Sequence, residues 1–213
     1  MKTEVFVVGA FEENTYLLED PATRDAVFID PGDDGEALAG IVHARGVNLV
    51  AIWLTHAHID HIGGVAGLKR QYDVPVYLHP SDLPIYRRAS EVAEMYQLPF
   101  EEPGLPEREL TEGDTLHVGS LDFRVMHVPG HAPGHVAFVG HGVAFSGDCL
   151  FAGSIGRTDL PLANGGQLEA SLERLAALPP DTRVLPGHGP ETTIARECAT
   201  NPFLTGVARP LSR

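Results

Sequence analysis

The chain has 213 residues, of which 43% are hydrophobic and 21% charged, and its formal net charge is −14 at neutral pH. This composition is typical of a globular protein, and the length predicts a single domain over residues 1–213. The acidic balance disfavours nucleic-acid and anionic membrane partners, because both attract clustered Lys and Arg. With two cysteines, no long apolar run and no secretory signal pattern, the sequence predicts a cytoplasmic protein without a disulfide framework.

The first part of the chain alternates between strand and helix patterns. Short runs rich in Val, Ile, Phe and Tyr, bounded by turn residues, predict strands over 5–8, 14–18, 26–29, 49–54 and 74–78. Apolar residues at helical spacing predict helices over 35–45 and 65–72. This alternation is typical of βαβ units and therefore of an α/β fold.

Residues 80–112 interrupt the alternation with five prolines and a charged helical pattern over 85–97. We expect a surface insertion here, which either covers a site or serves as a solvated connector. Strand patterns return over 115–118, 121–127, 136–139, 143–145 and 183–185, and helical patterns are found over 166–178 and 193–200.

Histidine is unusually frequent, with eleven residues in the chain, and the strongest chemical signal is the sequence THAHIDH at residues 55–61. It directly follows the strand predicted over 49–54, at the kind of strand end where open α/β sheets place their sites. His56 and His58 are two residues apart and can hold one ion, whereas Asp60 and His61 can reach in a second direction. A catalytic zinc uses about three protein ligands, so four ligand-type side chains are more than one such ion needs.

The same layout recurs at three further predicted strand ends. The sequences PGH at 129–131, SGD at 146–148 and PGH at 186–188 each place one metal-binding side chain after small residues, namely His131, Asp148 and His188. Glycine lets the backbone turn sharply at such positions. Seven ligands that include a carboxylate able to bridge fit two metal ions about 3.5–4 Å apart.

This arrangement resembles the metallo-β-lactamase superfamily, whose fold is a four-layer αββα sandwich, and within it the short bacterial glyoxalase II-like hydrolases. The resemblance extends nearly end to end, through FIDPG at 28–32, THAHIDH at 55–61, PGHAPGH at 129–135, SGD at 146–148, GRTD at 156–159 and PGHGP at 186–190. We expect no counterpart here of the C-terminal helical domain that holds glutathione in full-length glyoxalase II, and Pro190 stands where that enzyme has a Tyr.

The resemblance implies a role for each matched residue. One metal would be held by His56, His58 and His131, and the second by Asp60, His61 and His188, with Asp148 bridging the two. Asp60 and Asp148 are the candidate catalytic carboxylates, and Asp30 would orient the 55–61 loop. Arg157 stands where the family has a substrate-contacting Lys, and a structural ion pair is the alternative role for it.

The implied activity is hydrolysis of a small-molecule thioester such as S-D-lactoylglutathione by a hydroxide that bridges two divalent ions. Zinc is the first candidate metal, with iron and manganese as alternatives. Two other activities occur on the same fold. One is a persulfide dioxygenase that uses a single iron ion, and the other is a phosphodiesterase or RNA-processing nuclease, which the net charge of −14 disfavours.

Several other conspicuous residues have simpler interpretations. His135 is expected to be a turn residue rather than a ligand, and His79 a hydrogen-bonded structural histidine. Cys149 is expected to be a small buried apolar residue, because its side chain should point away from that of Asp148. Tyr86 and Tyr96 could line a pocket, although interior packing is the favoured role for both.

Overall fold

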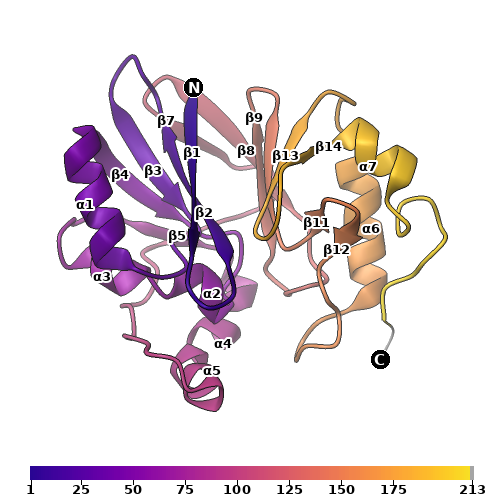
Figure 1. Ribbon diagram of the computed structural model, residues 1–213, viewed down its shortest axis with the longest axis horizontal. Coiled ribbons are helices and arrows are strands. Elements are labelled where there is room, and N and C mark those ends of the chain that lie inside the picture. Colours follow the sequence, from indigo (N-terminus) through magenta and orange to yellow (C-terminus); the bar gives the residue numbers. More distant parts are fainter. Residues whose placement is uncertain (212–213) are drawn as a thin grey trace.

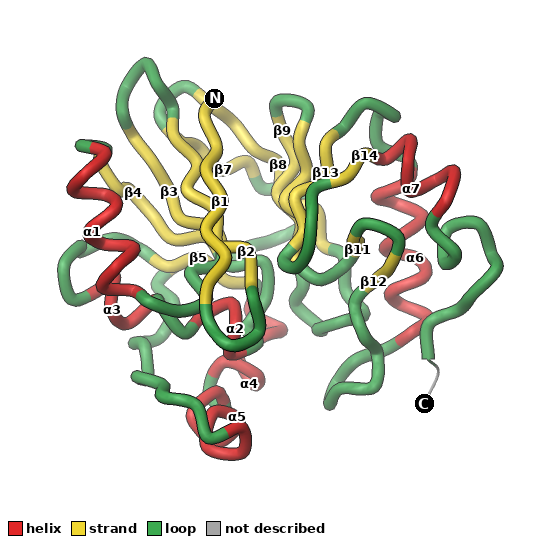
Figure 2. Tube along the Cα trace, in the orientation of Figure 1, coloured by secondary structure: helices red, strands yellow, loops and turns green. Residues whose placement is uncertain are grey.

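The computed structural model describes residues 1–211, and its strands form two six-stranded sheets that pack face to face (Figures 1 and 2). The first sheet has the order β1 (Lys2–Val8), β2 (Glu13–Glu19), β3 (Asp25–Ile29), β4 (Asn48–Trp53), β5 (Val76–Leu78) and β6 (Arg108–Glu109). The second has the order β14 (Thr192–Thr193), β13 (Arg183–Pro186), β10 (Val143–Gly147), β9 (Val136–Gly140), β8 (Leu121–His127) and β7 (Thr115–Val118). A small hairpin joins β11 (Leu150–Phe151) to β12 (Ser154–Ile155).

Helices cover the outer faces of both sheets. They are α1 (Gly35–Arg45), α2 (Ile59–Ile62), α3 (Val65–Lys69), α4 (Leu83–Tyr86), α5 (Ala89–Tyr96), α6 (Gly165–Ala176) and α7 (Ile194–Thr200), with a 3-10 helix at Pro80–Asp82. In Figure 1, α1 and α3 lie on one side of the paired sheets and α6 and α7 on the other. The four layers confirm the predicted αββα sandwich.

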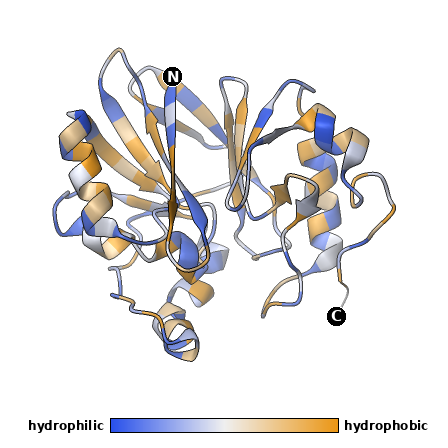
Figure 3. Cartoon of the chain, viewed as in Figure 1, coloured by the Kyte–Doolittle hydropathy of each residue, from blue (hydrophilic) through white to orange (hydrophobic). Residues whose placement is uncertain are grey.

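Three buried apolar clusters hold the layers together. Between the sheets, Trp53 packs edge-on to Phe123 and at a tilt to Phe138, with ring centroids 6.0 and 5.3 Å apart. Successive residues of a strand point to opposite faces, so Leu17 of β2 belongs to the cluster under α1, and its neighbour Leu18 to the one between the sheets. Figure 3 shows the same layering as hydrophobic colour along the strands and alternating bands on α6.

Most predicted elements are confirmed, with shifts of a few residues at their ends. The helix predicted over 65–72 ends at Lys69, and the one predicted over 85–97 is divided into α4 and α5. The sequence did not predict α2, β6, β11, β12 or β14, because an element of two to four residues is too short to carry a periodic apolar pattern.

The segment 80–112, which we expected at the surface, is partly integrated into the fold. Its strand β6 extends the first sheet beside β5, and Tyr86 and Leu110 are buried. Its helix α5 lies at the end of the sandwich where α2 also lies (Figures 1 and 2). Among the helices within residues 1–211, none is long and apolar enough to cross a membrane.

Candidate metal centre

The predicted ligands meet at one edge of the sandwich. His56 follows β4 of the first sheet, whereas His131, Asp148 and His188 follow β8, β10 and β13 of the second. Strand β13 is parallel to β10. Strand β9 is antiparallel to both β10 and β8, so β8 runs in the same direction as β10 and β13. Strands that run the same way end at the same edge of a sheet, and this brings the side chains together from distant parts of the sequence.

The first group consists of His56, His58 and His131. One nitrogen from each ring lies within 4.8 Å of the others, and His58 Nδ1 is 2.9 Å from His131 Nε2. The rings stand edge to face, with centroids 4.6 to 5.0 Å apart. The structure thus brings together the three residues predicted for one metal.

The second group consists of Asp60, His61 and His188, whose ligand atoms also lie within 4.8 Å of one another. His188 Nε2 is 3.2 Å from Asp60 Oδ2, and His61 Nε2 is 3.8 Å from the same oxygen. Asp60 and His61 belong to α2, so one short helix directs both toward His188 from the second sheet.

Asp148 lies between the two groups. Its Oδ1 is 3.5 Å from His61 Nε2, and its Oδ2 is 3.5 Å from His131 Nε2 and 3.6 Å from His188 Nε2. The carboxylate therefore faces the first group and the second group at once, as expected of a residue predicted to bridge.

Backbone carbonyls select which nitrogen each histidine presents. His131 Nδ1 is 2.9 Å from the carbonyl of Arg157, and His188 Nδ1 is 3.1 Å from the carbonyl of Phe11. A carbonyl oxygen only accepts, so each Nδ1 must carry a proton, and in the neutral ring the lone pair lies on Nε2. Both Nε2 atoms face Asp148.

Asp30 orients the 55–61 loop from behind. Its Oδ1 accepts a hydrogen bond from the Thr55 backbone N–H at 2.7 Å, and its Oδ2 accepts from Thr55 Oγ1 at 2.6 Å. The same Oδ2 lies 3.0 Å from His61 Nδ1, and Thr55 Oγ1 lies 3.0 Å from His56 Nδ1. One carboxylate thereby sets the rings of both His56 and His61, directly or through a hydroxyl.

Unpartnered buried atoms show that the site fits cations. Within residues 1–211, His56 Nε2, His61 Nε2 and Asp148 Oδ1 are buried without a hydrogen-bond partner. Each such atom costs about 1–3 kcal/mol unless something else satisfies it. All three are ligand-type atoms in or beside the two groups, and two divalent ions would satisfy them.

The electrostatics also favour positive charge. Burial, with help from the neighbouring His61, holds the pKa of His56 well below its ordinary value, so its imidazole is neutral. Burial alone would raise the pKa of Asp148, but His61 and His131 outweigh it and keep that carboxyl ionised. Neutral imidazole and carboxylate are the forms that bind metals. Burial alone would lower the pKa of His61, but the carboxylates of Asp148 and Asp60 raise it well above its ordinary value. The surroundings of this ring therefore stabilise positive charge.

Two glycines make room for Asp148. Gly147 has φ +46°, a conformation that other residues rarely adopt, and a Cβ there would overlap Thr55 Oγ1. At Gly187 a Cβ would overlap Asp148 Oδ1 itself. The glycines of SGD at 146–148 and of PGH at 186–188 are therefore required by close approach.

Two positioning residues were missed from the sequence, and a third, His135, has a contact that the sequence did not indicate. Asp82 is buried and accepts hydrogen bonds from the backbone N–H groups of Ala57 at 3.0 Å and Gly134 at 2.5 Å, which ties two ligand loops together. His135, expected as a turn residue, accepts from the Asp148 N–H at 2.9 Å. Glu13 is buried with Oε1 3.8 Å from His61 Nδ1. An acidic residue soon after the predicted strand over 74–78 was the available signal for Asp82.

The simpler interpretations of other residues are mostly confirmed. His79 Nδ1 accepts from the Ser81 N–H at 3.3 Å, and Cys149 is buried in an apolar cluster. Tyr86 packs in the interior and donates to the carbonyl of Gly104. Tyr96 has both of the roles considered, because it is 52% exposed and lines a cavity while its ring packs edge-on against Phe11 with centroids 5.5 Å apart.

That cavity opens directly above the ligands and has a volume of about 700 Å³. Its floor contains five of the seven predicted ligands, namely His58, Asp60, His131, Asp148 and His188. The size lies within the range of small-molecule sites. Arg157 also lines it, and the guanidinium binds Asp159 through Nε at 2.7 Å and Nη2 at 2.8 Å.

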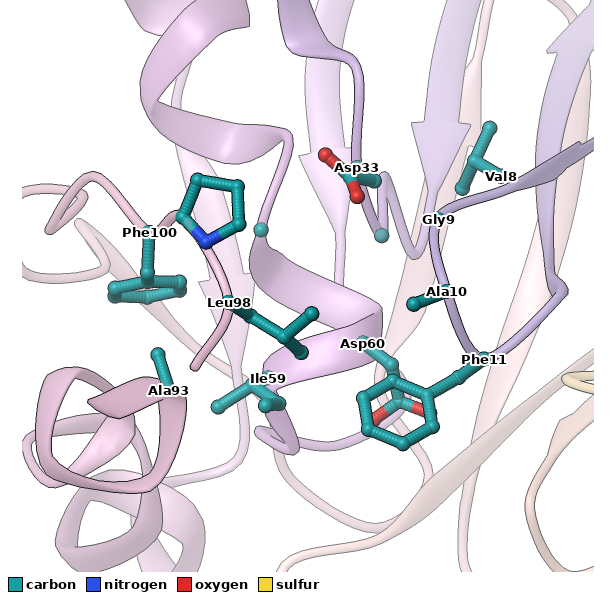
Figure 4. A pocket seen from close by; sticks show the side chains of 13 residues that line it. Val8, Gly9, Ala10, Phe11, Asp33, Ile59, Asp60, Ala93, Leu98 and Phe100 are labelled. Atoms are coloured by element: carbon teal, nitrogen blue, oxygen red, sulfur yellow. The ribbon is translucent and has the colours of Figure 1, made fainter. Parts of the chain in front are cut away.

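A second, much smaller pocket lies next to α2 (Figure 4). Its volume is about 30 Å³, which is room for roughly one water molecule. Phe11, Ile59 and Asp60 line both spaces. Of the two, the larger cavity has room for a substrate.

Comparison with known proteins identifies the class to which this site belongs. Residues 8–188 match the family model of the metallo-beta-lactamase superfamily. The chain therefore belongs to the metallo-beta-lactamase superfamily of metallo-hydrolases, as the sequence predicted.

Individual relatives are similar over nearly their whole length. The chain is 37% identical over 209 residues to hydroxyacylglutathione hydrolase GloC of Haemophilus influenzae, which covers 96% of this chain and 98% of that protein. The crystal structure of TTHA1623 in a di-iron-bound form is 50% identical with a TM-score of 0.88, covering 94% of this chain and 100% of that one. That of BLEG-1, a B3 metallo-beta-lactamase, is 38% identical with a TM-score of 0.90, covering 96% and 100%.

Proposed function

We propose that this chain is a binuclear metal-dependent hydrolase that cleaves thioesters, with S-D-lactoylglutathione as the first substrate to test. The observation that carries the proposal is the position of Asp148, whose two oxygens face the two ligand groups. A carboxylate placed there can be shared by two cations, as two-metal hydrolases require. The similarity to GloC, a hydroxyacylglutathione hydrolase by name, supports a thioester as the substrate.

The proposed ligands are His56, His58 and His131 for one ion and Asp60, His61 and His188 for the other, with Asp148 shared. Zinc suits this mixture of imidazole and carboxylate, and the di-iron form of TTHA1623 supports iron as an alternative. When bound, two such ions supply a hydroxide at neutral pH and polarise a carbonyl oxygen.

The chain's own residues position the reactants. The N–H of Asp148 donates to His135, and Asp30 fixes the ring of His61, so the charges around the reacting carbonyl need no rearrangement during the reaction. The cavity above the floor holds the substrate beside these groups. We further propose that residues 1–213 act as one domain and, because both cysteines are free, that the protein works in the reducing cytoplasm.

The test is turnover of S-D-lactoylglutathione by metal-loaded protein, followed as loss of the thioester. His188→Ala should abolish turnover, whereas His117→Ala, which changes an exposed histidine on β7, should leave it unchanged. Absence of turnover in protein that contains two metal ions per chain would reject S-D-lactoylglutathione as a substrate.

The same variant tests the alternative of a persulfide dioxygenase with one iron ion. Such an enzyme would keep its activity after loss of His188, because the first ligand group is untouched. Oxygen uptake with glutathione persulfide, measured on the wild type and on His188→Ala, distinguishes the two activities.

A further inference from the structure

The cavity above the metal centre has two apolar walls. One comes from the α4–α5 segment, which contributes Ile85, Ala89, Val92, Met95 and Tyr96. The other comes from the β11–β12 hairpin and the loop before α6, which contribute Phe151, Ile155, Leu160, Pro161 and Leu162. In Figure 1, α4 and α5 lie at the lower end of the sandwich, and the loop before α6 reaches toward the same end. Apart from Arg88 and Arg157, the charged and ligand-type side chains of the cavity lie in its floor.

The walls expose apolar surface to solvent. Ten large apolar side chains are exposed within residues 1–211, and four of them border this cavity: Phe11, Met95, Tyr96 and Leu162. Contiguous exposed apolar surface on a folded protein marks a binding site, because leaving it in water is unfavourable. Because this apolar surface is continuous with the predicted metal ligands in the floor, the group that covers it is part of the molecule that reacts there.

Leu162 has an unfavourable backbone conformation in addition to an exposed apolar side chain. Its φ is +67°, which is strained for a bulky side chain, and the side chain is 60% exposed. Neither interior packing nor a preferred backbone conformation explains a leucine at this position. Strained residues concentrate at ligand sites, where the surrounding structure holds them in place.

The cations of the cavity are already paired. Among the described lining residues the Lys and Arg side chains are those of Arg88 and Arg157. Arg88 Nε binds Glu91 at 2.9 Å, and Arg157 binds Asp159 through two nitrogens. A charged group placed between the walls would have to displace one of these ion pairs to gain a counter-charge, whereas a hydrocarbon chain would gain burial directly.

We infer that the cavity binds the acyl half of the thioester and that the preferred substrates carry a linear apolar acyl chain rather than the hydroxylated lactoyl group. This inference rests on the proposed thioester hydrolysis and names its substrate class. The polar thiol half then extends toward solvent.

The test holds the thiol constant and varies the acyl group. Acetyl, D-lactoyl, butanoyl and hexanoyl thioesters of glutathione are compared by kcat/KM on metal-loaded protein. Each methylene that enters the cavity should raise kcat/KM about three- to fourfold, as apolar burial predicts. A D-lactoyl thioester cleaved as well as the hexanoyl one, or better, would overturn the inference and leave thioester hydrolysis intact.

A variant pair tests the wall directly. Leu162→Asn removes the apolar side chain, and Asn tolerates a positive φ, so the variant should fold at least as stably as the wild type. The ratio of hexanoyl to acetyl kcat/KM should fall about tenfold or more. Leu105→Asn is the matched control, because Leu105 is also 60% exposed but lies outside the cavity lining, and its ratio should stay at the wild-type value. Equal ratios in both variants would contradict the inference.

Binding of thioethers separates this inference from the proposed reaction. S-hexylglutathione and S-methylglutathione cannot be hydrolysed, and calorimetry compares their affinities for the metal-loaded protein. Tighter binding of the hexyl compound, lost in Leu162→Asn, would support the apolar cavity even if every thioester were resistant to cleavage. Equal affinities for the two thioethers would reject a preference of the cavity for apolar acyl chains, whether or not any thioester is cleaved.

Discussion

The floor and the walls of the cavity differ in how their side chains are held. Asp148 in the floor and His61 next to it are buried, and each is positioned by hydrogen bonds with a second layer that includes Asp30 and His135. In the walls, Met95 and Leu162 are 80% and 60% exposed. The floor supports chemistry that depends on sub-ångström geometry, whereas the walls need only be apolar. Relatives on this fold can therefore share the floor while their walls, and with them the substrates, change.

The largest effect should follow from a change in the centre of the floor. Asp148→Asn removes the charge shared by the two ligand groups, so we expect thioester hydrolysis to fall more than about 100-fold, beyond the loss typical of residues that only support ligands. Metal content measured by mass spectrometry should fall with it. Asp122→Asn, an exposed aspartate on β8, is the control. Activity above a tenth of the wild-type value would contradict a shared role for Asp148.

The layer behind the floor should give a smaller effect. Asp30→Asn weakens the acceptor for both Thr55 and His61, and we expect metal affinity or activity to fall about 10–100-fold. Asp34→Asn is a matched control, because Asp30 and Asp34 both have positive φ, at 49° and 51°, and Asn tolerates that conformation. If the two variants bind metal equally well, the hydrogen bonds of Asp30 do not position the ligands.

Asp82 tests how separate the two regions are, since it directly precedes α4 of the wall but holds two loops that carry predicted ligands. Asp82→Ala leaves the N–H groups of Ala57 and Gly134 without an acceptor, which costs about 1–3 kcal/mol for each. Thermal unfolding of the metal-loaded protein should therefore occur at a lower temperature than for the exposed control Asp73→Ala. Equal unfolding temperatures would show that Asp82 does not join the loops.

The smallest effect is expected at Arg157, which belongs to both regions. Its backbone carbonyl orients His131, while its side chain lies in the wall and pairs with Asp159. Arg157→Ala keeps the carbonyl, so metal content should be unchanged. Exposed ion pairs contribute at most about 1 kcal/mol, so KM should change within about fivefold. A large loss of metal would instead assign the side chain a role in the floor.

The sequence indicated the positions of side chains best where a ligand-type residue directly follows a strand in the chain. His56, His131, Asp148 and His188 each follow a recognisable apolar strand, and the structure brings all four together at one edge. The sequence indicated least about Asp82 and Glu13. A buried carboxylate that binds backbone groups distant in sequence has the same local pattern as one in a solvated turn.

The sequence by itself determined the set of ligand-type residues and an α/β fold, because strand patterns and the small residues at strand ends are local properties. The four-layer αββα arrangement followed from the resemblance to the metallo-β-lactamase superfamily. Only the tertiary structure decided that Asp148 faces both groups, which depends on β10 ending between β8 and β13 at the same edge. It also decided the character of the walls, since Tyr96 and Leu162 line one cavity although they lie far apart in the chain. An apolar residue on a helix can be buried or can face a substrate, and only packing with the rest of the chain distinguishes the two.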